Sequence, residues 1–456
     1  EQGLAAGLDA EARAFAELAS QPSTRNLIWL FMVTQGRKRR GSEGARPVER
    51  LGVVGAGFMG AAIAEVGAAA GLTVRVRDMT PQAVARGVAA IRRMVDQGVR
   101  RGRFSEGEGR QVLQRVSSTT DYSGFARSEV VIEAVFEDLA VKRSVLAEVE
   151  ATVGPEVVIA TNTSALPIHE IARDARNPER VLGMHFFSPA ERMPLLEVVR
   201  PRAATDTAVA TAVSLGVRMG KTVIVVRDSP GFYTSRVLGV MLNEAVVLLG
   251  EGAAMEEVDR ALAAFGFPVG PFVLYDEVGL AVAQHAGASI AAAFSSRLPY
   301  TSLVPKLVEA GHAGKRSGSG FYLWPARRKL PKPLDRFVPE PPRAPNPAVY
   351  QLLGRPGRGP FGEREIQDRL VLLFVNEAIR CLEEGVLASP GDGDLGAVLG
   401  LGFPPFRGGP FHYADSLGLA ALEARLRRLA DLCGPRYAPS ELLVARARAG
   451  ESFFAG

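Results

Sequence analysis

Several residue types that define whole classes of protein are scarce in this chain of 456 residues. Its two cysteines, Cys381 and Cys433, supply neither a disulfide framework nor a zinc-ligand spacing, so we expect no metal site and a reducing, cytoplasmic location. The longest apolar run near the start covers residues 26–33, far short of the ~20 residues that a membrane-spanning helix needs. With 47% hydrophobic and 23% charged residues, the composition is that of an ordinary globular protein.

A large excess of charge of one sign is also lacking. The chain has 54 Lys and Arg against 49 Asp and Glu, which leaves a formal net charge of +5. An excess this small suits an anionic small substrate at least as well as nucleic acid. Because no basic stripe interleaved with aromatic residues is present, we expect no nucleic-acid partner.

Apolar periodicity divides the chain into successive segments. They are a helical segment with a basic linker at 1–45, alternating strands and helices at 46–228, a helical segment at 229–323, a proline-rich linker at 324–362, and a second helical segment at 363–456. Short apolar strands are expected at 51–54, 73–76, 130–132, 157–160, 181–184 and 222–226. Strands that alternate with helices predict an α/β domain with a doubly wound parallel sheet.

The two helical segments repeat one another. Asn243-Glu-Ala-Val recurs as Asn376-Glu-Ala-Ile at an offset of 133 residues, and Gly270-Pro-Phe recurs as Gly409-Pro-Phe at an offset of 139 residues. We interpret them as two tandem all-α domains, the first copy and the second copy, that pack as a pseudo-two-fold pair. The Gly-Pro-Phe segments are expected to form turns and helix starts.

A glycine-rich turn follows the first expected strand. Gly55, Gly57 and Gly60 form Gly-x-Gly-x-x-Gly, with Phe58 and Met59 inside the motif and a helical pattern directly behind it. The first glycine permits the tight turn, the second lets the backbone approach a pyrophosphate, and the third lets helix and strand pack closely. The combination predicts a Rossmann-type dinucleotide site, in which the helix N-terminus holds the phosphates.

An acidic residue identifies the dinucleotide. Asp78 follows the second expected strand, 23 residues after Gly55. Its carboxylate would accept hydrogen bonds from the adenosine ribose and repel a 2′-phosphate, which favours NAD over NADP. Arg75 and Arg77 lie beside it and leave some tolerance of NADP open.

A histidine and a glutamate are candidates for proton transfer. His185 ends an expected strand, where ligands gather in open α/β sheets. Glu197 follows twelve residues later in an apolar stretch, where an unpaired carboxylate would be costly. A carboxylate partner fixes the tautomer of a histidine and raises its basicity, so the pair is a candidate general base.

Several motifs resemble the L-3-hydroxyacyl-CoA dehydrogenase family. They are Gly55-Ala-Gly-Phe-Met-Gly60, Asn162-Thr-Ser-Ala-Leu166, Met184-His-Phe-Phe-Ser-Pro189 and Asp228-Ser-Pro-Gly-Phe232. The doubled helical domain, with Phe265-Gly-Phe-Pro-Val-Gly-Pro271 and Arg316-Ser-Gly-Ser-Gly-Phe-Tyr322, is similar to the dehydrogenase part of the multifunctional α-subunits of fatty-acid β-oxidation, of the trifunctional type. The resemblance covers essentially the whole chain.

This resemblance implies a role for each matching residue. His185 would take the proton from the C3 hydroxyl of the substrate, Glu197 would hold the imidazolium that forms, and Ser164 would bind the substrate oxygen. The family's cofactor contacts fall on the glycine turn (Gly55, Gly57, Phe58, Met59, Gly60), Asp78, Glu137, Lys142 and Asn162. For Glu137 and Lys142, an ordinary loop acid and a first-turn helix lysine remain the alternative.

One position departs from the single-function dehydrogenases of the family. They carry Asn where this chain has Ser235, although trifunctional-type relatives carry a small hydroxyl residue there. Ser235 is therefore a candidate substrate contact. Whether its side chain binds the thioester carbonyl is left open by the replacement of Asn. A catalytically silent scaffold remains an alternative function, as does a related NAD-dependent hydroxy-acid dehydrogenase that uses a lysine base.

The resemblance also implies partners. It predicts an acyl-CoA substrate, an upstream enoyl-CoA hydratase domain in the native protein, and a thiolase β-subunit that binds it. Residues 1–36 look like the helix that joins hydratase and dehydrogenase in such proteins. The 456 residues themselves lack the oxyanion-hole glycines and paired carboxylates that hydration needs, so they should not hydrate enoyl-CoA.

Overall fold

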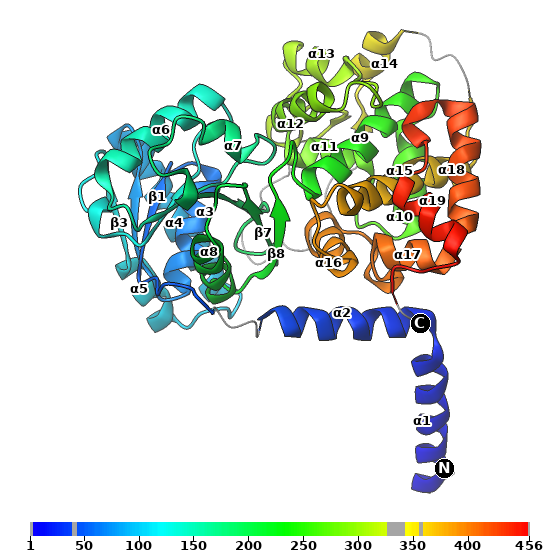
Figure 1. Ribbon diagram of the computed structural model, residues 1–456, viewed down its shortest axis with the longest axis horizontal. Helices are drawn as coiled ribbons and strands as arrows, with labels where there is room; N and C mark the ends of the chain where they lie inside the picture. The colour runs from blue at the N-terminus through cyan, green and yellow to red at the C-terminus, as the bar shows by residue number, and fades with distance from the viewer. Residues whose placement is uncertain (1–2, 39–42, 326–342, 355–358, 455–456) are drawn as a thin grey trace. The chain divides into compact units, whose positions relative to one another are not determined.

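The structure is a computed structural model that describes residues 3–38, 43–325, 343–354 and 359–454 (Figure 1). It divides into two compact units: Glu1–Thr234 with Glu384–Tyr413, and Ser235–Glu383 with Ala414–Gly456. The second copy is therefore shared between the two units. Part of the basic linker (39–42) and two parts of the proline-rich linker (326–342 and 355–358) lie outside the described residues.

The first unit is built on an eight-stranded sheet of order β3-β2-β1-β4-β5-β6-β7-β8. Its strands are β1 (Arg50–Val54), β2 (Thr73–Arg77), β3 (Val116–Thr119), β4 (Val130–Glu133), β5 (Val158–Thr161), β6 (Val181–Phe186), β7 (Leu195–Arg200) and β8 (Thr222–Arg227). The strands are rich in valine and isoleucine, whose branched side chains suit a buried pleated sheet. The predicted α/β doubly wound fold is confirmed.

Two strands of this eight-stranded sheet, β3 and β7, were not predicted from the sequence, and β7 runs antiparallel to its neighbour β6. β7 pairs antiparallel with β6, whereas the pairs from β3 to β6 are parallel. The connection between β6 and β7 is too short for the crossover that parallel neighbours require, so the chain returns as a hairpin. β3 was missed because its Ser and Thr side chains give no apolar run.

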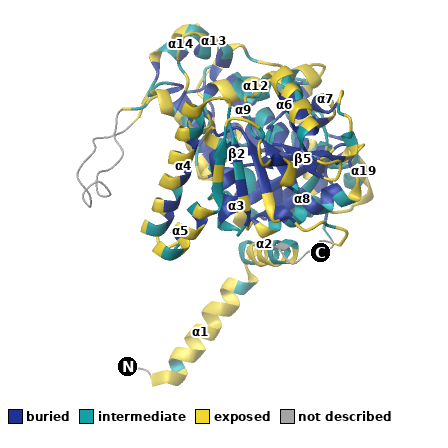
Figure 2. Cartoon of the chain, turned by 90° about the vertical axis from the view of Figure 1, so that its left-hand side faces the viewer, coloured by how far each residue is buried: buried dark blue, intermediate teal, exposed yellow. Residues whose placement is uncertain are grey.

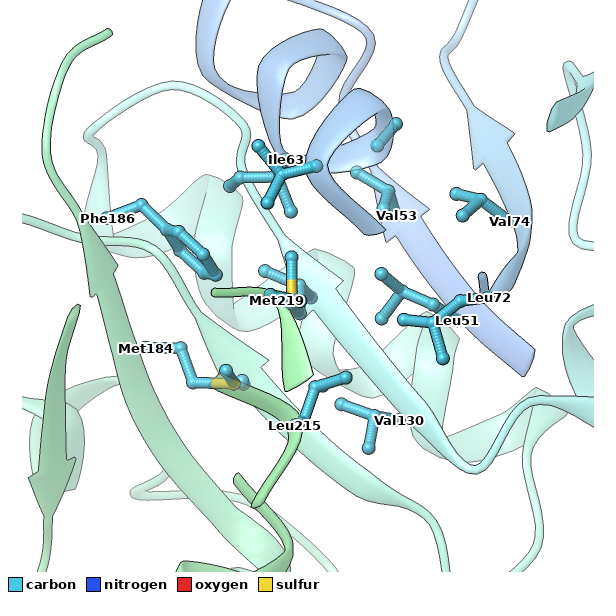
Figure 3. Close-up of a cluster of buried hydrophobic side chains, with 14 of the residues drawn as sticks. Leu51, Val53, Ile63, Leu72, Val74, Val130, Met184, Phe186, Leu215 and Met219 are labelled. Atoms are coloured by element: carbon cyan, nitrogen blue, oxygen red, sulfur yellow. The ribbon is translucent and has the colours of Figure 1, made fainter. Parts of the chain in front are cut away.

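Helices cover the sheet and bury its apolar side chains. They are α3 (Phe58–Ala69), α4 (Pro81–Arg100), α5 (Glu106–Gln114), α6 (Leu139–Thr152), α7 (Ile168–Ile171), α8 (Asp206–Arg218) and α16 (Pro390–Leu401). Figure 3 shows Ile63 of α3 and Leu215 of α8 gathered with Leu51 and Val53 of β1 in one hydrophobic core. This core holds the sheet rigid beneath the ends of its strands.

Two N-terminal helices precede the sheet. They are α1 (Gly3–Ser20) and α2 (Pro22–Lys38), where one helical segment was predicted. No residue of α1 is buried (Figure 2), whereas α2 contacts β8 and α16, and its Trp29 ring lies 4.1 Å from the ring of His412. Within the described residues, we find no helix that joins sufficient length to sufficient apolar character to cross a bilayer.

The second unit is helical. Its main elements are α9 (Thr234–Gly250), which begins at the boundary between the units, α10 (Met255–Phe265), α11 (Pro271–Val278), α12 (Leu280–Ala293), α13 (Leu303–Glu309), α14 (Pro347–Leu353), α15 (Glu363–Glu383), α18 (Leu419–Cys433) and α19 (Glu441–Ala449). A short antiparallel pair, β9 (Tyr322–Leu323) and β10 (Ala344–Pro345), lies beside them. α17 (Pro410–Leu417) runs across the boundary between the units.

Buried ion pairs join the two copies reciprocally within this unit. Glu244 of the first copy accepts hydrogen bonds from Arg369 (2.9 Å) and Arg436 (2.6 Å) of the second copy. Glu377, its counterpart in the second copy, accepts bonds from Arg236 (2.5 Å) and Arg297 (2.6 Å) of the first copy. The exchange of equivalent contacts is the mark of a two-fold arrangement, which supports the predicted pseudo-two-fold packing.

A buried aspartate starts the helix after each Gly-Pro-Phe segment. Asp259 accepts the backbone N–H of Phe272 (2.9 Å), and Asp394 accepts that of Phe411 (2.7 Å). Burial raises the pKa of both aspartates to about 6. The Gly-Pro-Phe segments are therefore helix starts in both copies, as predicted, and Asp394 differs from Asp259 in bonding a histidine, His412, instead of a tyrosine.

The reciprocal ion pairs yield a test of stability. Glu377→Gln should lower the free energy of unfolding by about 3–5 kcal/mol, because it leaves two arginines without their counter-charge. Urea denaturation followed by circular dichroism measures the loss. Glu423→Gln, which breaks a surface pair with Arg427, is the control and should cost at most about 0.5 kcal/mol. Equal losses would contradict a structural role for the buried cluster.

Candidate active site

The carboxyl ends of the parallel strands bring the candidate residues to one edge of the sheet. Asp78 follows β2, the glycine turn follows β1, Glu133 ends β4, Ser164 follows β5, and His185 lies near the end of β6. The order of strands reverses between β1 and β4, the place where ligands bind in open α/β sheets. The fold thus gathers residues that lie more than a hundred positions apart in the sequence.

The glycine turn has the shape of a dinucleotide cradle. Gly55 has a φ of +100°, and a Cβ there would lie 2.6 Å from the carbonyl oxygen of Ala134. A Cβ on Gly60 would lie 1.8 Å from the carbonyl oxygen of Gly55, so neither glycine can be replaced without moving backbone. Gly57 faces open space at the N-terminus of α3, where backbone N–H groups point outward. Phosphates of a dinucleotide fit this space.

The two residues between Gly57 and Gly60 differ in their surroundings. Met59 packs against the core beneath the turn. Phe58 is 51% exposed, beside the open space at Gly57. Met59 therefore anchors the turn, and Phe58 presents an apolar surface where a cofactor would lie.

Asp78 ties the second strand to the glycine turn. Its Oδ2 accepts the backbone N–H of Ala56 (2.8 Å), and its Oδ1 accepts that of Met79 (2.7 Å). The carboxylate is thus held at the edge of the cradle before any cofactor arrives. Its replacement would disturb the turn as well as the recognition of a ribose.

Both arginines beside Asp78 are engaged elsewhere. Arg75 donates from Nε to the carbonyl of Ser123 (3.0 Å), and the guanidinium of Arg77 lies 4.5 Å from the ring centre of Tyr122. Arg77 also lies 3.7 Å from Glu148. These contacts hold the two guanidinium groups toward the loop after β3, an arrangement that favours the predicted preference for NAD.

His185 and Glu197 meet across the β6–β7 pair. They stand opposite one another in the register, and His185 Nδ1 lies 2.9 Å from Glu197 Oε2. Glu197 is fully buried and also accepts the Thr234 hydroxyl (2.7 Å) and the backbone N–H groups of Tyr233 (3.1 Å) and Thr234 (3.2 Å). The Thr234 hydroxyl and these two N–H groups are donors, so both oxygens of Glu197 act as acceptors. Because a carboxylate only accepts, the Nδ1 of His185 must carry the hydrogen.

A strained turn directs two of those donors. Phe232 has a φ of +52°, a left-handed conformation that is unfavourable for a bulky residue, and Gly231 before it has a φ of +72°. The turn aims the next two N–H groups at Glu197. Such strain persists only where the surroundings over-determine it, and it marks functional sites often enough to support the assignment here.

Aromatic rings enclose the histidine. The ring centre of Phe187 lies 4.5 Å from that of His185, and the ring centre of Phe232 lies 6.1 Å away. Asn162, predicted as a cofactor contact, accepts the backbone N–H of Phe186 with its Oδ1 (2.8 Å) and so fixes the strand beside His185. The rings limit the approach of water to the imidazole.

A second buried network surrounds Lys142. Its Nζ donates to Glu133 Oε1 (2.9 Å) and Oε2 (3.1 Å) and lies 3.4 Å from Glu137 Oε2, while its side chain is 1% exposed. Glu133 also accepts the Thr161 hydroxyl (2.6 Å) and the backbone N–H of Val135 (2.6 Å). In this structure the lysine charge is therefore shared by two carboxylates, which the sequence analysis did not foresee.

Glu137 links this network to Ser164. Its Oε1 accepts the backbone N–H of Ser164 (2.9 Å), the Ser164 hydroxyl (3.2 Å) and the Thr163 hydroxyl (2.6 Å). Burial raises the pKa of the Glu137 carboxyl, but the Lys142 ammonium and these hydrogen bonds outweigh it, so the pKa lies below its ordinary value. Glu137 is thus ionised at neutral pH and orients the Ser164 hydroxyl.

The sequence analysis missed some residues of this site, and one residue that it predicted belongs to the other unit. Glu133 ends an apolar strand, and a charge in that position is the signal that could have revealed it. Thr234 stands next to the predicted Ser235 but carried no signal of its own. Ser235 lies in the first turn of α9 and belongs to the second unit, whereas the other predicted site residues belong to the first.

Two family models match most of the chain. Residues 50–229 match the NAD-binding domain of 3-hydroxyacyl-CoA dehydrogenase. Its C-terminal domain matches residues 231–324 and again residues 366–452, which confirms the internal repeat. The Rossmann-type domain and the helical domains therefore correspond to the two parts of one known enzyme architecture.

Solved structures agree. A 3-hydroxybutyryl-CoA dehydrogenase from Escherichia coli is 30% identical, with 89% of this chain and 99% of that chain covered at a TM-score of 0.75. An (S)-3-hydroxybutyryl-CoA dehydrogenase from Ralstonia eutropha is 34% identical over 61% of this chain and 100% of that chain (TM-score 0.59). The dehydrogenase part of multifunctional enzyme 1 from C. elegans shares the fold at 22% identity, with 88% and 90% covered (TM-score 0.59).

The network at Lys142 predicts a pH-dependent effect on stability. Lys142→Met should lower the free energy of unfolding by about 3–5 kcal/mol at neutral pH, because Glu133 and Glu137 lose their counter-charge. Since the pKa of Glu137 is lowered by folding, its contribution is present above the ordinary value of 4.5 and is lost as pH falls through the lower folded value. The difference from wild type should therefore narrow at about pH 4.

Urea denaturation at both pH values measures this difference. Lys315→Met, which removes a surface lysine paired with Glu277, serves as the control and should change stability little at either pH. A loss at Lys142 that is the same at both pH values would contradict the charge argument and indicate lost packing instead.

Proposed function

Because the chain belongs to the 3-hydroxyacyl-CoA dehydrogenase family and is an NAD-dependent oxidoreductase, we propose that it oxidises L-3-hydroxyacyl-CoA to 3-oxoacyl-CoA in fatty-acid β-oxidation. The contact of 2.9 Å between His185 Nδ1 and Glu197 Oε2 carries the proposal. It supplies the base that oxidation of an alcohol requires, at the sheet edge that holds the dinucleotide cradle.

The residues of the first unit fit NAD. Gly57 leaves room for the pyrophosphate at the N-terminus of α3, Gly55 and Gly60 permit the turn, and Asp78 would accept bonds from the adenosine ribose. Bound NAD supplies the acceptor, at nicotinamide C4, for the hydride that leaves C3 of the substrate. We propose Phe58, Met59, Glu137, Lys142 and Asn162 as further residues that shape or contact the cofactor site.

His185 performs the proton transfer. Since its Nδ1–H is directed at Glu197, the unprotonated Nε2 is the atom that can accept a proton. It takes the proton of the C3 hydroxyl as the carbonyl forms, and the resulting imidazolium is balanced by the Glu197 carboxylate. Burial of the pair strengthens this balance, because the attraction between charges grows as the local dielectric falls.

Serine hydroxyls complete the proposed substrate site. Ser164 would turn its hydroxyl hydrogen from Glu137 to the substrate oxygen when substrate binds, and so stabilise charge that develops there. We propose Ser235 as a second hydroxyl contact, in the place where single-function relatives carry Asn. Short-chain substrates are the first to test, because two similar proteins are named for 3-hydroxybutyryl-CoA.

The resemblance to multifunctional α-subunits extends the proposal to partners. An upstream hydratase domain and a thiolase β-subunit would supply the hydroxyacyl-CoA and consume the oxoacyl-CoA, in a cytoplasmic setting that the low cysteine content suits. The chain itself should not hydrate crotonyl-CoA, and turnover of that substrate by these 456 residues would contradict the division of labour.

Steady-state kinetics test the proposed activity. NADH should form from NAD with L-3-hydroxyacyl-CoA and not with the D-isomer. His185→Ala should lower kcat by about 10²–10⁴-fold because the base is lost, and Glu197→Gln should lower it because the imidazolium loses its counter-charge. NADH fluorescence should show that both variants still bind the cofactor.

His285→Ala is the matched control, since His285 is exposed on α12 and bonds only its own helix among the contacts described. Full activity in His185→Ala would refute the proposed base. A wild-type chain that binds NADH but oxidises no hydroxyacyl-CoA would favour a different hydroxy acid, and one that neither binds nor reacts would favour a scaffold.

Replacement of Asp78 tests the preference for NAD. Asp78→Ser should lower kcat/KM for NAD by about 10–100-fold, because bonds of a charged acceptor to the ribose are worth about 1.5–3 kcal/mol. Activity with NADP should rise little, since Arg75 and Arg77 are engaged with the loop after β3. Asp78→Asn keeps an acceptor for the N–H of Ala56 and separates turn stability from ribose recognition. An unchanged NAD to NADP ratio would contradict this role.

A further inference from the structure

A helix of the second copy lies against the strands that carry the candidate base. α16 packs on β7 and β8 within the first unit, and Figure 1 shows it in orange beside β8. Three of its inward residues are glycines: Gly393, Gly396 and Gly400. Glycine inside a helix costs about 1 kcal/mol relative to alanine, so these three inward glycines need a reason in packing.

The first copy shows that the helix itself does not require these glycines. When Asp394 is aligned with Asp259, which starts the following helix in the same way, Gly393 and Gly396 fall on Val258 and Ala261 of α10. The first copy thus carries side chains where the second copy has none. The difference follows what each helix packs against.

Gly396 allows α16 to approach the strand beside Glu197. A Cβ on Gly396 would lie 2.9 Å from Ile224 Cδ1 and 2.9 Å from Tyr233 Cε1. Ile224 is the residue of β8 that stands opposite Glu197 in the register. A side chain at this position of α16 would therefore press on the strand next to the carboxylate.

Tyr233 connects α16 directly to the carboxylate. Its hydroxyl donates to the carbonyl oxygen of Gly393 (2.8 Å), and its backbone N–H donates to Glu197 Oε1 (3.1 Å). Tyr233 is fully buried and follows the strained Phe232. The bond to α16 thus helps to hold the turn that aims donors at Glu197.

Gly400 lies close to two residues that flank the His185–Glu197 pair. A Cβ there would lie 2.5 Å from Leu195 Cδ2 and 3.2 Å from Phe187 Cε1, and the ring of Phe187 lies tilted beside that of His185. Leu195 begins β7, two residues before Glu197. The same helix therefore supports a ring against His185 and the strand that carries Glu197.

We propose that α16 positions the His185–Glu197 pair, with Gly393, Gly396 and Gly400 as positioning residues that act through Tyr233, Ile224 and Phe187. This role rests on the proposed function, because it concerns the geometry of the proposed base. The second copy then contributes to the rate of the reaction without touching substrate or cofactor.

Gly396→Ala tests the proposal. It should lower kcat by about 10–100-fold through displacement of the pair, while KM and the affinity for NADH stay within about twofold of wild type. Gly391→Ala on the same helix is the matched control, because a Cβ at Gly391 meets only ordinary contacts at 3.7 Å or more, and its kcat should be unchanged. Ile224→Val removes the Cδ1 that the new methyl would strike and should restore part of kcat in the Gly396→Ala background.

Tyr233→Phe is a second test in case Gly396→Ala does not fold, because it removes the hydrogen bond to Gly393 without adding volume. It should lower kcat several-fold with KM unchanged. Circular dichroism identifies a variant that fails to fold. If Gly396→Ala does not fold, the kcat of Tyr233→Phe tests the positioning role instead. An active wild type whose kcat is unaltered by Gly396→Ala or, if that variant does not fold, by Tyr233→Phe would overturn the positioning role alone. A wild type without L-3-hydroxyacyl-CoA oxidation would overturn the proposed function and, with it, this role.

Discussion

The buried carboxylate of Glu197 is the constraint on which the rest of the site depends. A charge removed from water is costly unless donors surround it, and this one needs four. Two antiparallel strands must pair so that His185 stands opposite it, and the chain must turn through a left-handed Phe232 to present two N–H groups. The hairpin, the strained turn and the start of α9 thus all supply partners to one buried carboxyl group.

The same rule governs charge elsewhere in the chain. Lys142 lies between two carboxylates, and Glu244 and Glu377 are each held by two arginines of the other copy. These charges are buried or only partly exposed, so each needs its partner in place before the surrounding helices or strands can close. Ion pairs of this kind specify register and orientation in addition to whatever stability they supply, which explains how one chain aligns two copies of a domain without ambiguity.

Sequence patterns could reveal the parts of this arrangement that are local. Runs such as Val130-Val-Ile, the glycine turn and the matched Asn-Glu segments identify strands, cradle and repeat, because a few neighbouring residues determine each. The antiparallel direction of β7, the partnership of Lys142 with Glu133, and the donors from Thr234 depend on residues brought together by the whole sheet. No periodicity within a short window records such contacts. Strand position and apolar context made His185 and Glu197 candidates, and the resemblance to a family assigned their roles, but neither revealed the turn that holds them.

Duplication within one chain permits a division of labour that a symmetric dimer does not. In a homodimer every residue serves in both subunits, so a helix that packs on a catalytic strand cannot differ from its symmetry mate. Here α10 keeps Val258 and Ala261, while α16 has glycine at both positions and approaches Tyr233 and Ile224 closely. Likewise Asp259 bonds a tyrosine where Asp394 bonds His412. The reciprocal arginine–glutamate clusters preserve the symmetric contact between the copies, and the residues beyond them are free to diverge toward what each copy packs against.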